Sequence, residues 1–333
     1  MKIFYVKHIA LYVIWGMSSL VLGILLTELV AQYYMNSIAK HGKLMHNDPV
    51  SGWKPLANLD VTRVNNDGQL WKIRTNQNGF RTIPNWATAA TRRILILGDS
   101  FAFGEGVNQQ DRFDSIIAHK EPTWSIMNLG VMAYGTDQEF IVGQPFFSDL
   151  QSGDIVILLT YFNDYIDILR THFAGRAKPW FQIHQDGTVQ LHAPEIGLYE
   201  ILRDHSYLMT KIGIWLEPDL YNYSAEDVKQ GLMLYYAITK HYIPRLIERG
   251  INFVIVRHGE HLLTQSQHVP PEAFTQIFNN LRHHYPPLRY IVLENLLDTS
   301  SCHTFFLSDG HWNVNGHRQV GEKLHEYLRK MSP

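Results

Sequence analysis

Five short aliphatic runs between residues 93 and 295 constrain the fold more than any other feature of the sequence. They are RILIL (93–97), SIMNL (125–129), DIVILLTY (154–161), NFVIVRH (252–258) and RYIVLEN (289–295). Apolar runs that do not alternate with polar residues predict strands buried on both faces, as in a parallel sheet. Because stretches with helical potential separate most of these runs, we predict an α/β domain over 91–331 with a mostly parallel five-stranded sheet.

The N-terminus adds an apolar segment of a different kind. Ile9–Thr27 is uncharged, and at about 1.5 Å per residue it approaches the ~30 Å hydrocarbon core of a bilayer. A secretory signal peptide is the alternative, but its apolar region is usually shorter, ~7–15 residues, and Ala31 offers only a poor cleavage site. We therefore predict one uncleaved transmembrane helix within residues 1–34.

Basic residues on the two sides of this anchor are nearly balanced in number, so they barely favour either orientation. Lys2 and Lys7 precede the apolar segment, and Lys40 and Lys43 follow it. The very short N-terminal tail favours a single-pass helix with its N-terminus inside. The bulk of the chain is then expected in the periplasm or elsewhere outside the cytoplasm.

Two further regions interrupt the strand–helix rhythm. Residues 35–90 form a polar lead-in segment, in which Asn66-Asp67-Gly68 predicts a hairpin turn. Residues 166–223 contain a second hairpin pattern around Asp186-Gly187 and resemble an insertion between the third and fourth strands. Loops on that side of α/β sheets border the ligand site, so we expect a lid or a substrate wall there.

Composition excludes several classes of function. The formal net charge is −2 and no basic run stands out, so nothing favours nucleic-acid binding. Cys302 is the single cysteine, which rules out an internal disulfide and a cysteine-cluster zinc site. His258 and His261 have a metal-like spacing, but no zinc-enzyme motif accompanies them. We predict no metal and no organic cofactor.

Polar residues follow four of the predicted strands, at the edge where α/β enzymes keep their sites. In chain order these loops carry Gly98-Asp99-Ser100, then Asn128 and Gly130, then Asn163 and Asp164, and finally Asp309 and His311. The strand pattern does not require any of these side chains. Asp99 and Asp164 are expected to hold their turns by hydrogen bonds.

Together these loops supply the parts of a serine hydrolase. Serine needs a base to take its proton, and the base needs an orienting acid. We assign Ser100 as nucleophile, His311 as base and Asp309 as orienting acid. The backbone N–H groups of Ser100 and Gly130 and the amide of Asn163 form the predicted oxyanion hole. Taken singly, each has a structural alternative: a helix N-cap for Ser100 and turn residues for Gly130 and Asn163.

This set of residues resembles the SGNH hydrolases, the GDSL-like lipase/acylhydrolase superfamily, over about 93–331. The family's four signature residues fall on Ser100, Gly130, Asn163 and His311. The resemblance implies a flavodoxin-like three-layer α/β/α sandwich. One departure is Tyr161, which occupies a position that is usually glycine and could line the pocket.

The spacing Asp309-Gly-His311 differs from the family's common Asp-x-x-His. It resembles the branch that includes alginate O-acetyltransferase proteins and other membrane-anchored, polysaccharide-modifying proteins. Asp137 and Gln138 lie in a phrase, YGTDQ, that also resembles this branch. They are candidates for substrate contact, with helix capping as the alternative.

The resulting hypothesis is a membrane-anchored serine esterase that removes an O-acyl group, expected to be O-acetyl, from a carbohydrate or a small ester. A first alternative is an O-acetyltransferase of an exported polysaccharide that uses the same site. A second is an inactive carbohydrate-binding or scaffolding protein. Beside the ester substrate and the membrane, proteins of polysaccharide assembly are candidate partners.

Overall fold

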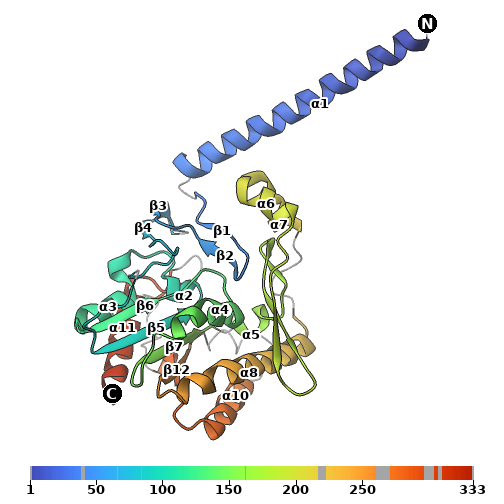
Figure 1. Cartoon of the computed structure of the whole chain (residues 1–333). Helices are drawn as coiled ribbons and strands as arrows, with labels where there is room; N and C mark the ends of the chain where they lie inside the picture. Colours follow the sequence, from blue (N-terminus) through green and yellow to red (C-terminus); the bar gives the residue numbers. More distant parts are fainter. Residues whose placement is uncertain are drawn as a thin grey trace.

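The computed structural model describes residues 2–38, 42–65, 67–83, 85–161, 163–216, 223–259, 271–295, 304–306 and 310–331. Its core is a five-stranded sheet in which every pairing is parallel (Figure 1). The sheet strands are β5 (Arg92–Gly98), β6 (Trp124–Asn128), β7 (Ile155–Thr160), β12 (Asn252–Arg257) and β13 (Arg289–Val292). All five predicted strands are confirmed.

The strand order across the sheet is β13-β12-β7-β5-β6. Counted along the chain, this is the order 2-1-3-4-5 of flavodoxin-like folds. The first strand, β5, therefore lies between β6 and β7. The loops that follow these three neighbouring strands must meet at one edge of the sheet.

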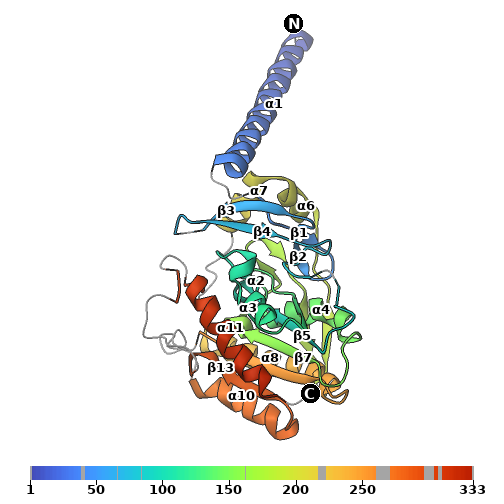
Figure 2. The same ribbon diagram turned by 90° about the vertical axis from the view of Figure 1, so that its left-hand side faces the viewer.

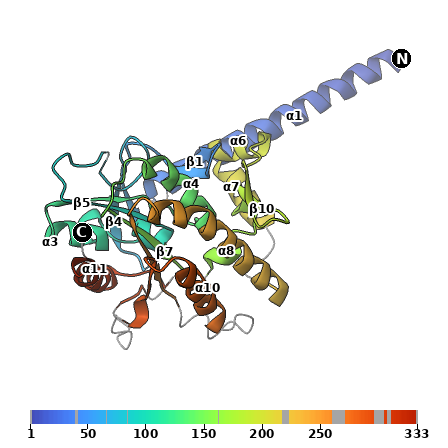
Figure 3. The same ribbon diagram turned by 60° about the horizontal axis from the view of Figure 1, so that its bottom comes forward.

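Successive residues of the strands enter two different cores, which is why the runs are continuously apolar. Leu95 and Leu97 pack on one face, and Ile94 and Ile96 pack on the other. Helices α4 (Thr136–Phe147), α8 (Ala225–Ile247) and α10 (Pro271–His284) cover the first face. Helices α3 (Phe113–Lys120) and α11 (Val314–Arg329) cover the second (Figure 3). The expected three layers are confirmed.

Local signals set the ends of the covering helices. Ser224 caps α8 by accepting a hydrogen bond from the Asp227 N–H, and the Asp227 carboxylate accepts from the Ser224 N–H in return. Asn313 caps α11 by accepting from the Asn315 and Gly316 N–H groups. Such caps satisfy N–H groups that have no partner inside the helix.

The lead-in segment forms two antiparallel hairpins above the strand ends (Figure 2). Their strands are β1 (Met45–Asp48) with β2 (Gly52–Pro55), and β3 (Asp60–Val64) with β4 (Leu70–Arg74). The turn predicted around Asp67 and Gly68 does join β3 to β4, although Asn66 lies outside the described residues. Trp71 and Ile73 of β4 pack on Phe103, which follows β5. The lead-in therefore rests on the loop that carries Ser100.

In its described residues, the segment between β7 and α8 contains four short strands and three helices. They are α5 (Asp164–Asp167), β8 (His172–Phe173), β9 (Arg176–Ala177), β10 (Trp180–Ile183), β11 (Val189–His192), α6 (Leu198–His205) and α7 (Tyr207–Leu216). The predicted hairpin around Asp186 is confirmed as β10–β11.

Helix α1 (Lys2–Tyr33) projects away from the rest of the chain (Figure 1). It continues as one π-helical turn, Tyr34–Ile38. Within it Leu11–Ser37 has a mean hydropathy of 1.9. It has the length and composition of a membrane anchor or of a signal sequence.

Candidate active site

Ser100 is the first residue of the short helix α2 (Ser100–Phe103), directly after β5. Asp99 caps this helix by accepting a hydrogen bond from the Phe101 N–H at 2.9 Å. The predicted turn-holding role of Asp99 is thus confirmed. Because the cap is Asp99 itself, the Ser100 hydroxyl is not needed for capping and remains half-buried at the sheet edge.

The Ser100 hydroxyl faces a histidine. Ser100 Oγ lies 2.7 Å from His311 Nε2, across 211 residues of sequence. His311 stands just before Asn313, the N-cap of α11, and its backbone carbonyl accepts from the Phe306 N–H at 2.8 Å. This is the geometry expected for a serine nucleophile and its general base.

Asp309, the predicted orienting acid, lies outside the described residues, so its role stays a prediction. The structure adds a carboxylate that the sequence did not suggest. Glu105 Oε2 lies 3.7 Å from His311 Nε2. Gly104 and Gly106 flank Glu105 with φ of 76° and 83°, and this Gly-Glu-Gly turn is the sequence signal that could have pointed to it. Glu105 approaches the ring nitrogen that faces Ser100, so its charge stabilises a protonated imidazole.

Gly130 follows β6 and packs tightly on α2. A Cβ at this position would lie 2.5 Å from the Ala102 carbonyl carbon and closer still to the Phe103 nitrogen. The Gly130 N–H donates to Asn128 Oδ1 at 2.9 Å, and Asn128 Nδ2 donates to the Ala102 carbonyl at 2.8 Å. Asn128 therefore ties the Gly130 loop to the serine loop. To bind an oxyanion, the Gly130 N–H must either break its hydrogen bond to Asn128 Oδ1 or donate to both acceptors at once.

Asn163 follows β7, on the other side of β5. Its Nδ2 donates to Asp167 Oδ2 at 2.6 Å, one helical turn along α5. An amide nitrogen carries two protons, so the second proton remains available for a substrate oxygen. Asp164 Oδ2 accepts from the Tyr161 N–H at 2.8 Å, which confirms its predicted role in the turn.

Aromatic rings pack against one another beside the catalytic residues. Phe101 is buried, and its ring centroid lies 4.8 Å from that of His311 and 4.7 Å from that of Tyr161. Tyr161 in turn stacks on His258 at 4.8 Å. Half-buried Tyr161 thus lies in the wall beside the site, and substrate contact by it stays a prediction. His258 is a ring in this cluster, and its predicted partner in a metal-like spacing, His261, lies outside the described residues.

Asp137 and Gln138, the other candidates for substrate contact, are fully buried in the first turn of α4. Asp137 forms an ion pair with Lys178, whose side chain is also fully buried. Gln138 Nε2 donates to the Ser51 carbonyl at 2.7 Å. The structure does not bring these two side chains to Ser100 and His311, and their enclosed partners favour a structural role.

Behind the catalytic loops lies a group of buried carboxyl side chains. Its members are Asp99, Asp137, Glu139, Asp164 and Asp167. They lie in the loops and first helical turns that follow β5, β6 and β7, which are neighbours in the sheet. Lys178 pairs with Asp137, and Arg170 Nε lies 3.4 Å from Asp167 Oδ1. This group could not be recognised from the sequence, because each acid alone fits a cap or a turn.

Burial raises the pKa of these acids. It raises the pKa of Asp99 to about 7, although the Phe101 N–H and His311 oppose the shift. It raises the pKa of Asp167 to about 6, opposed by Arg170 and Lys178. The pKa values of Glu139 and Asp164 are raised well above the ordinary range by burial and by neighbouring carboxylates. Desolvation disfavours the charged form, so burial favours the protonated forms of Glu139 and Asp164.

The arrangement can therefore perform acyl chemistry at a serine. Within the described ranges, no group of three or more His, Cys, Asp or Glu side chains is placed to hold a metal ion. Ser100, Gly130, Asn163 and His311 follow strands that meet at one sheet edge, as predicted. Asn128, Asp167, Lys178 and Glu105 are the supporting residues that sequence reasoning did not assign.

No protein-family model matches this sequence, and no curated protein matches it. Solved structures do resemble it. A member of the lipolytic protein G-D-S-L family from Veillonella parvula is 11% identical and covers 72% of this chain and 100% of its own, with a TM-score of 0.45. The psychrotrophic esterase EstA from Pseudoalteromonas sp., inhibited by monoethylphosphonate, is 11% identical over 72% of this chain and 97% of its own, with a TM-score of 0.41.

Proposed function

We propose that the protein is a serine esterase, a carboxylic ester hydrolase, in which Ser100 is the nucleophile and His311 the general base. The observation that carries this is the 2.7 Å contact between Ser100 Oγ and His311 Nε2 at the carboxyl edge of a parallel sheet. A histidine so distant in sequence meets the serine only because the end of the last strand and the start of α11 return to the same edge.

In the first step, Ser100 Oγ attacks the ester carbonyl carbon while its proton passes to His311 Nε2. The carbonyl π electrons move to oxygen, and the resulting oxyanion binds the Ser100 N–H and the second proton of Asn163 Nδ2. The Gly130 N–H joins them when it is released from Asn128 Oδ1. Such donors stabilise charge that develops only in the transition state.

Collapse of this intermediate breaks the carbon–oxygen bond of the ester. His311 gives its proton to the departing alkoxide, and an acyl-Ser100 intermediate remains. His311 then takes a proton from water, whose oxygen attacks the acyl carbon. The bond between the acyl carbon and Ser100 Oγ breaks, His311 returns the proton to Ser100 Oγ, and the acid is released. Glu105 stabilises the imidazolium in both steps, and Asp309 is proposed to hold the opposite ring nitrogen.

The proposed substrate is an O-acylated, specifically O-acetylated, carbohydrate. This rests on the spacing of Asp309 and His311, which resembles that of polysaccharide-modifying proteins. The same acyl-Ser100 could be taken by a sugar hydroxyl in place of water, so the O-acetyltransferase alternative shares every step up to the intermediate.

Helix α1 is proposed to be an uncleaved membrane anchor, with the catalytic domain outside the cytoplasm. The support is a contact between α1 and the folded domain. Glu28 of α1 accepts hydrogen bonds from the Ser206 hydroxyl at 2.7 Å and from the Tyr207 N–H at 2.8 Å.

Covalent labelling with a fluorophosphonate tests the proposal, because the reagent reacts with activated serines. Wild type should be labelled and should hydrolyse nitrophenyl acetate. Ser100→Ala should lose both labelling and hydrolysis, and His311→Gln should lose most of each. Ser206→Ala is the control and should keep both. Labelling of Ser100→Ala at the wild-type rate would contradict the proposal.

Product analysis with an acetylated oligosaccharide separates the two acyl acceptors. Hydrolysis gives free acetate whether or not an unacetylated sugar is added. Transfer gives an acetylated second sugar, at the expense of free acetate. A wild-type protein that binds the sugar but is neither labelled nor active would favour the non-enzymatic alternative.

A further inference from the structure

Helices α6 and α7 of the 166–223 segment expose apolar side chains, and α6 buries charged ones. Helix α6 buries Glu200 and Arg203, whereas Leu198 is 71% exposed. Ile201 and Leu202 share its exposed side, and Trp215 at the end of α7 is 82% exposed. A helix on a water-facing surface normally does the opposite. Exposed apolar side chains at helical spacing mark a surface that contacts something apolar.

The position of this surface indicates what covers it. The Glu28 carboxylate of α1 accepts hydrogen bonds from the backbone N–H groups of Tyr207 and Leu208 at the start of α7. A carboxylate is stabilised at a helix N-terminus, so this contact fixes α6 and α7 beside α1. Both views show the pair at the lower end of α1 (Figures 1 and 2). The apolar surface of α6 and α7 therefore begins where the apolar segment of α1 ends.

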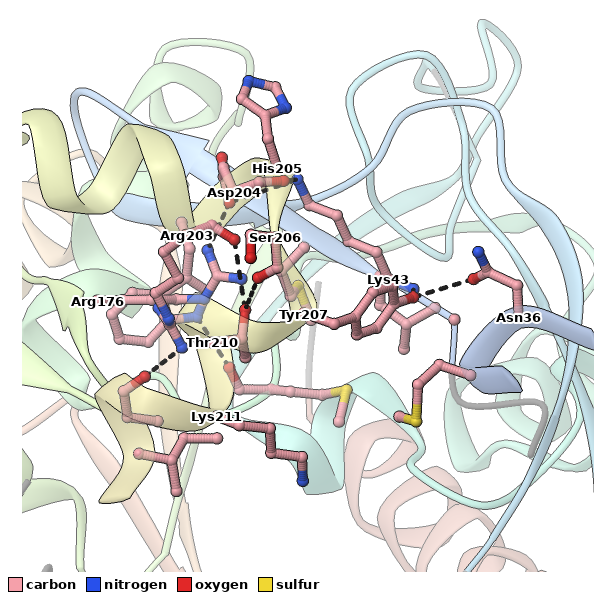
Figure 4. Close-up of a pocket in the computed structure, with 18 of the residues that line it drawn as sticks. Asn36, Lys43, Arg176, Arg203, Asp204, His205, Ser206, Tyr207, Thr210 and Lys211 are labelled. Carbon is pink, nitrogen blue, oxygen red and sulfur yellow. Dashed lines mark hydrogen bonds and ion pairs between the residues drawn. The ribbon is translucent and has the colours of Figure 1, made fainter. Parts of the chain in front are cut away.

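A pocket of about 850 Å³ opens between the end of α1, the β1 and β3 strands and the α6–α7 pair. Such a volume suits a small-molecule ligand. Its charged lining is mostly basic. The basic residues are Lys43, Arg63, Arg176, Arg203 and Lys211. Figure 4 shows four of them in the pocket wall, all but Arg63.

One carboxylate stands among these basic side chains in the described lining. Asp204 Oδ1 lies 3.4 Å from Lys43 Nζ and 3.2 Å from Arg176 Nη1. Two further carboxylates act at its margin: Glu105 interacts with Arg63, and Glu28 accepts hydrogen bonds from the lining residues Ser206 and Tyr207. Five basic side chains still outnumber these three carboxylates. Met35 and Ile214 add apolar lining from α1's end and from α7. A ligand that is anionic at one end and apolar at the other fits this combination.

We propose that this pocket binds the phosphate-bearing headgroup of an anionic phospholipid from the membrane that holds α1. The headgroup phosphate lies among the basic side chains, and the acyl chains lie along α1 and the exposed apolar residues of α6 and α7. Basic residues at a membrane surface attract anionic lipids, and arginine binds phosphate in bidentate fashion. The proposal rests on the anchor role of α1 in the proposed function.

The pocket also reaches the catalytic loops. Met132 and Ala133 line it, and they lie in the loop that carries Gly130. Burial lowers the pKa of Arg63, and the charge of Glu105, which stands beside His311, counteracts this shift. A bound lipid would therefore contact the loop that carries Gly130 and place the active site close to the membrane surface.

Lipid retention by the full chain tests the proposal. The protein is reconstituted in nanodiscs of phosphatidylcholine alone or mixed with phosphatidylglycerol, then released into mild detergent, and the lipid that stays bound is identified by native mass spectrometry. Wild type should retain one phosphatidylglycerol in preference to phosphatidylcholine. Arg63→Gln/Lys211→Gln should retain it roughly tenfold less, since each cation contributes to the attraction.

The matched control is Lys120→Gln/Lys240→Gln, which removes the same charge from exposed positions on α3 and α8. It should behave as wild type. Exposed Lys211→Gln alone, which removes no buried group, should lower retention severalfold. Equal phosphatidylglycerol retention in the pocket variants and the control would overturn the proposal. So would a displacement of the lipid by millimolar inorganic phosphate, which would identify a soluble anion as the ligand.

Fluorophosphonate labelling of the same samples distinguishes the two proposals. Labelled wild type without a retained lipid would reject the lipid site and leave the esterase intact. A retained lipid in a protein that is not labelled at Ser100 would reject the esterase and leave the lipid site intact. A pocket variant that is still labelled is folded at the active site, so its loss of lipid reports the pocket alone.

Discussion

The side-chain amide of Asn163 donates a hydrogen bond to the carboxylate of Asp167 at 2.6 Å. Asn163 is the N-cap of the short helix α5, and Asp167 is its last residue, one turn further along. Asp167 is 1% exposed, so water does not compete for this bond. The bond fixes which end of the amide is nitrogen, and it directs the remaining N–H of Asn163 away from Asp167.

Asp167 is therefore expected to act as a positioning residue. Asp167→Leu removes the acceptor while filling the space, and should lower kcat roughly tenfold to a hundredfold because the amide loses its orientation. KM for a small ester should change little. Asp167→Asn keeps a carbonyl acceptor and should restore most of kcat. Steady-state kinetics with nitrophenyl acetate measure both parameters.

Asn163→Ala provides the upper limit for this effect. It removes the oxyanion donor itself and should lower kcat by about 10²-fold to 10³-fold. If Asp167→Leu reduced activity in Asn163→Ala as much as in wild type, Asp167 would act by another route.

Gly130→Ala should damage folding and catalysis together. The new Cβ would lie 2.5 Å from the Ala102 carbonyl carbon and 2.6 Å from its Cβ. Neither group can move without shifting α2 and Ser100. We expect a loss of about 1–3 kcal/mol in unfolding free energy and a fall in fluorophosphonate labelling. Gly197→Ala is the control, since its nearest neighbour is the Glu200 carboxylate at 3.2 Å. Equal denaturation midpoints for the two variants would argue against this packing.

The buried carboxyl group of Asp99 should make stability depend on pH. Its pKa is raised to about 7 in the folded protein by burial, against about 3.9 for an unfolded chain. Between these values the folded state holds a proton that the unfolded state has released. The Asp99 carboxyl group therefore contributes fully to the free energy of unfolding below about pH 4, and this contribution is lost as pH rises through 7. The pKa of Asp167 is raised to about 6, so Asp167 changes stability with pH in the same direction.

Asp99→Asn should weaken this dependence. Asparagine can still accept from the Phe101 N–H but does not titrate, so the fall in Tm between pH 5 and pH 8 should become smaller. Asp186→Asn is the control, because Asp186 is exposed and its hydrogen bonds to Thr188 lower its pKa. Calorimetry across this pH range measures the difference, and parallel curves for wild type and Asp99→Asn would rule out the assignment.

The ion pair of Lys178 and Asp137 should be strongly coupled, since both side chains are fully buried. Lys178→Met leaves a buried carboxyl group without its cation and should cost about 3–5 kcal/mol of unfolding free energy. Lys178→Met/Asp137→Leu removes both charges and should recover much of that loss. A double-mutant cycle in denaturant gives the coupling directly. Additive losses would mean that the two groups do not interact.

Much of the fold could be predicted from the sequence, because its causes are local. The strands of the sheet are continuously apolar since both their faces are covered. The caps at Ser224 and Asn313 need only neighbouring residues, and so does the turn that joins β3 to β4. The same logic placed Ser100, Gly130, Asn163 and His311 at one edge, because parallel strands end together. Asp309 lies outside the described residues, and its assignment remains a prediction.

The sequence by itself thus determined the parallel sheet and the edge at which its polar loops gather. Only the tertiary structure decided which groups within those loops are partners. It assigned the Gly130 N–H to Asn128 and the Asn163 amide to Asp167, and it enclosed Asp137 and Gln138. It also turned the apolar side of α6 outward beside α1. Hydrogen-bond partners, burial and pKa depend on distances between residues that are far apart in the chain, and a local pattern carries no such distances.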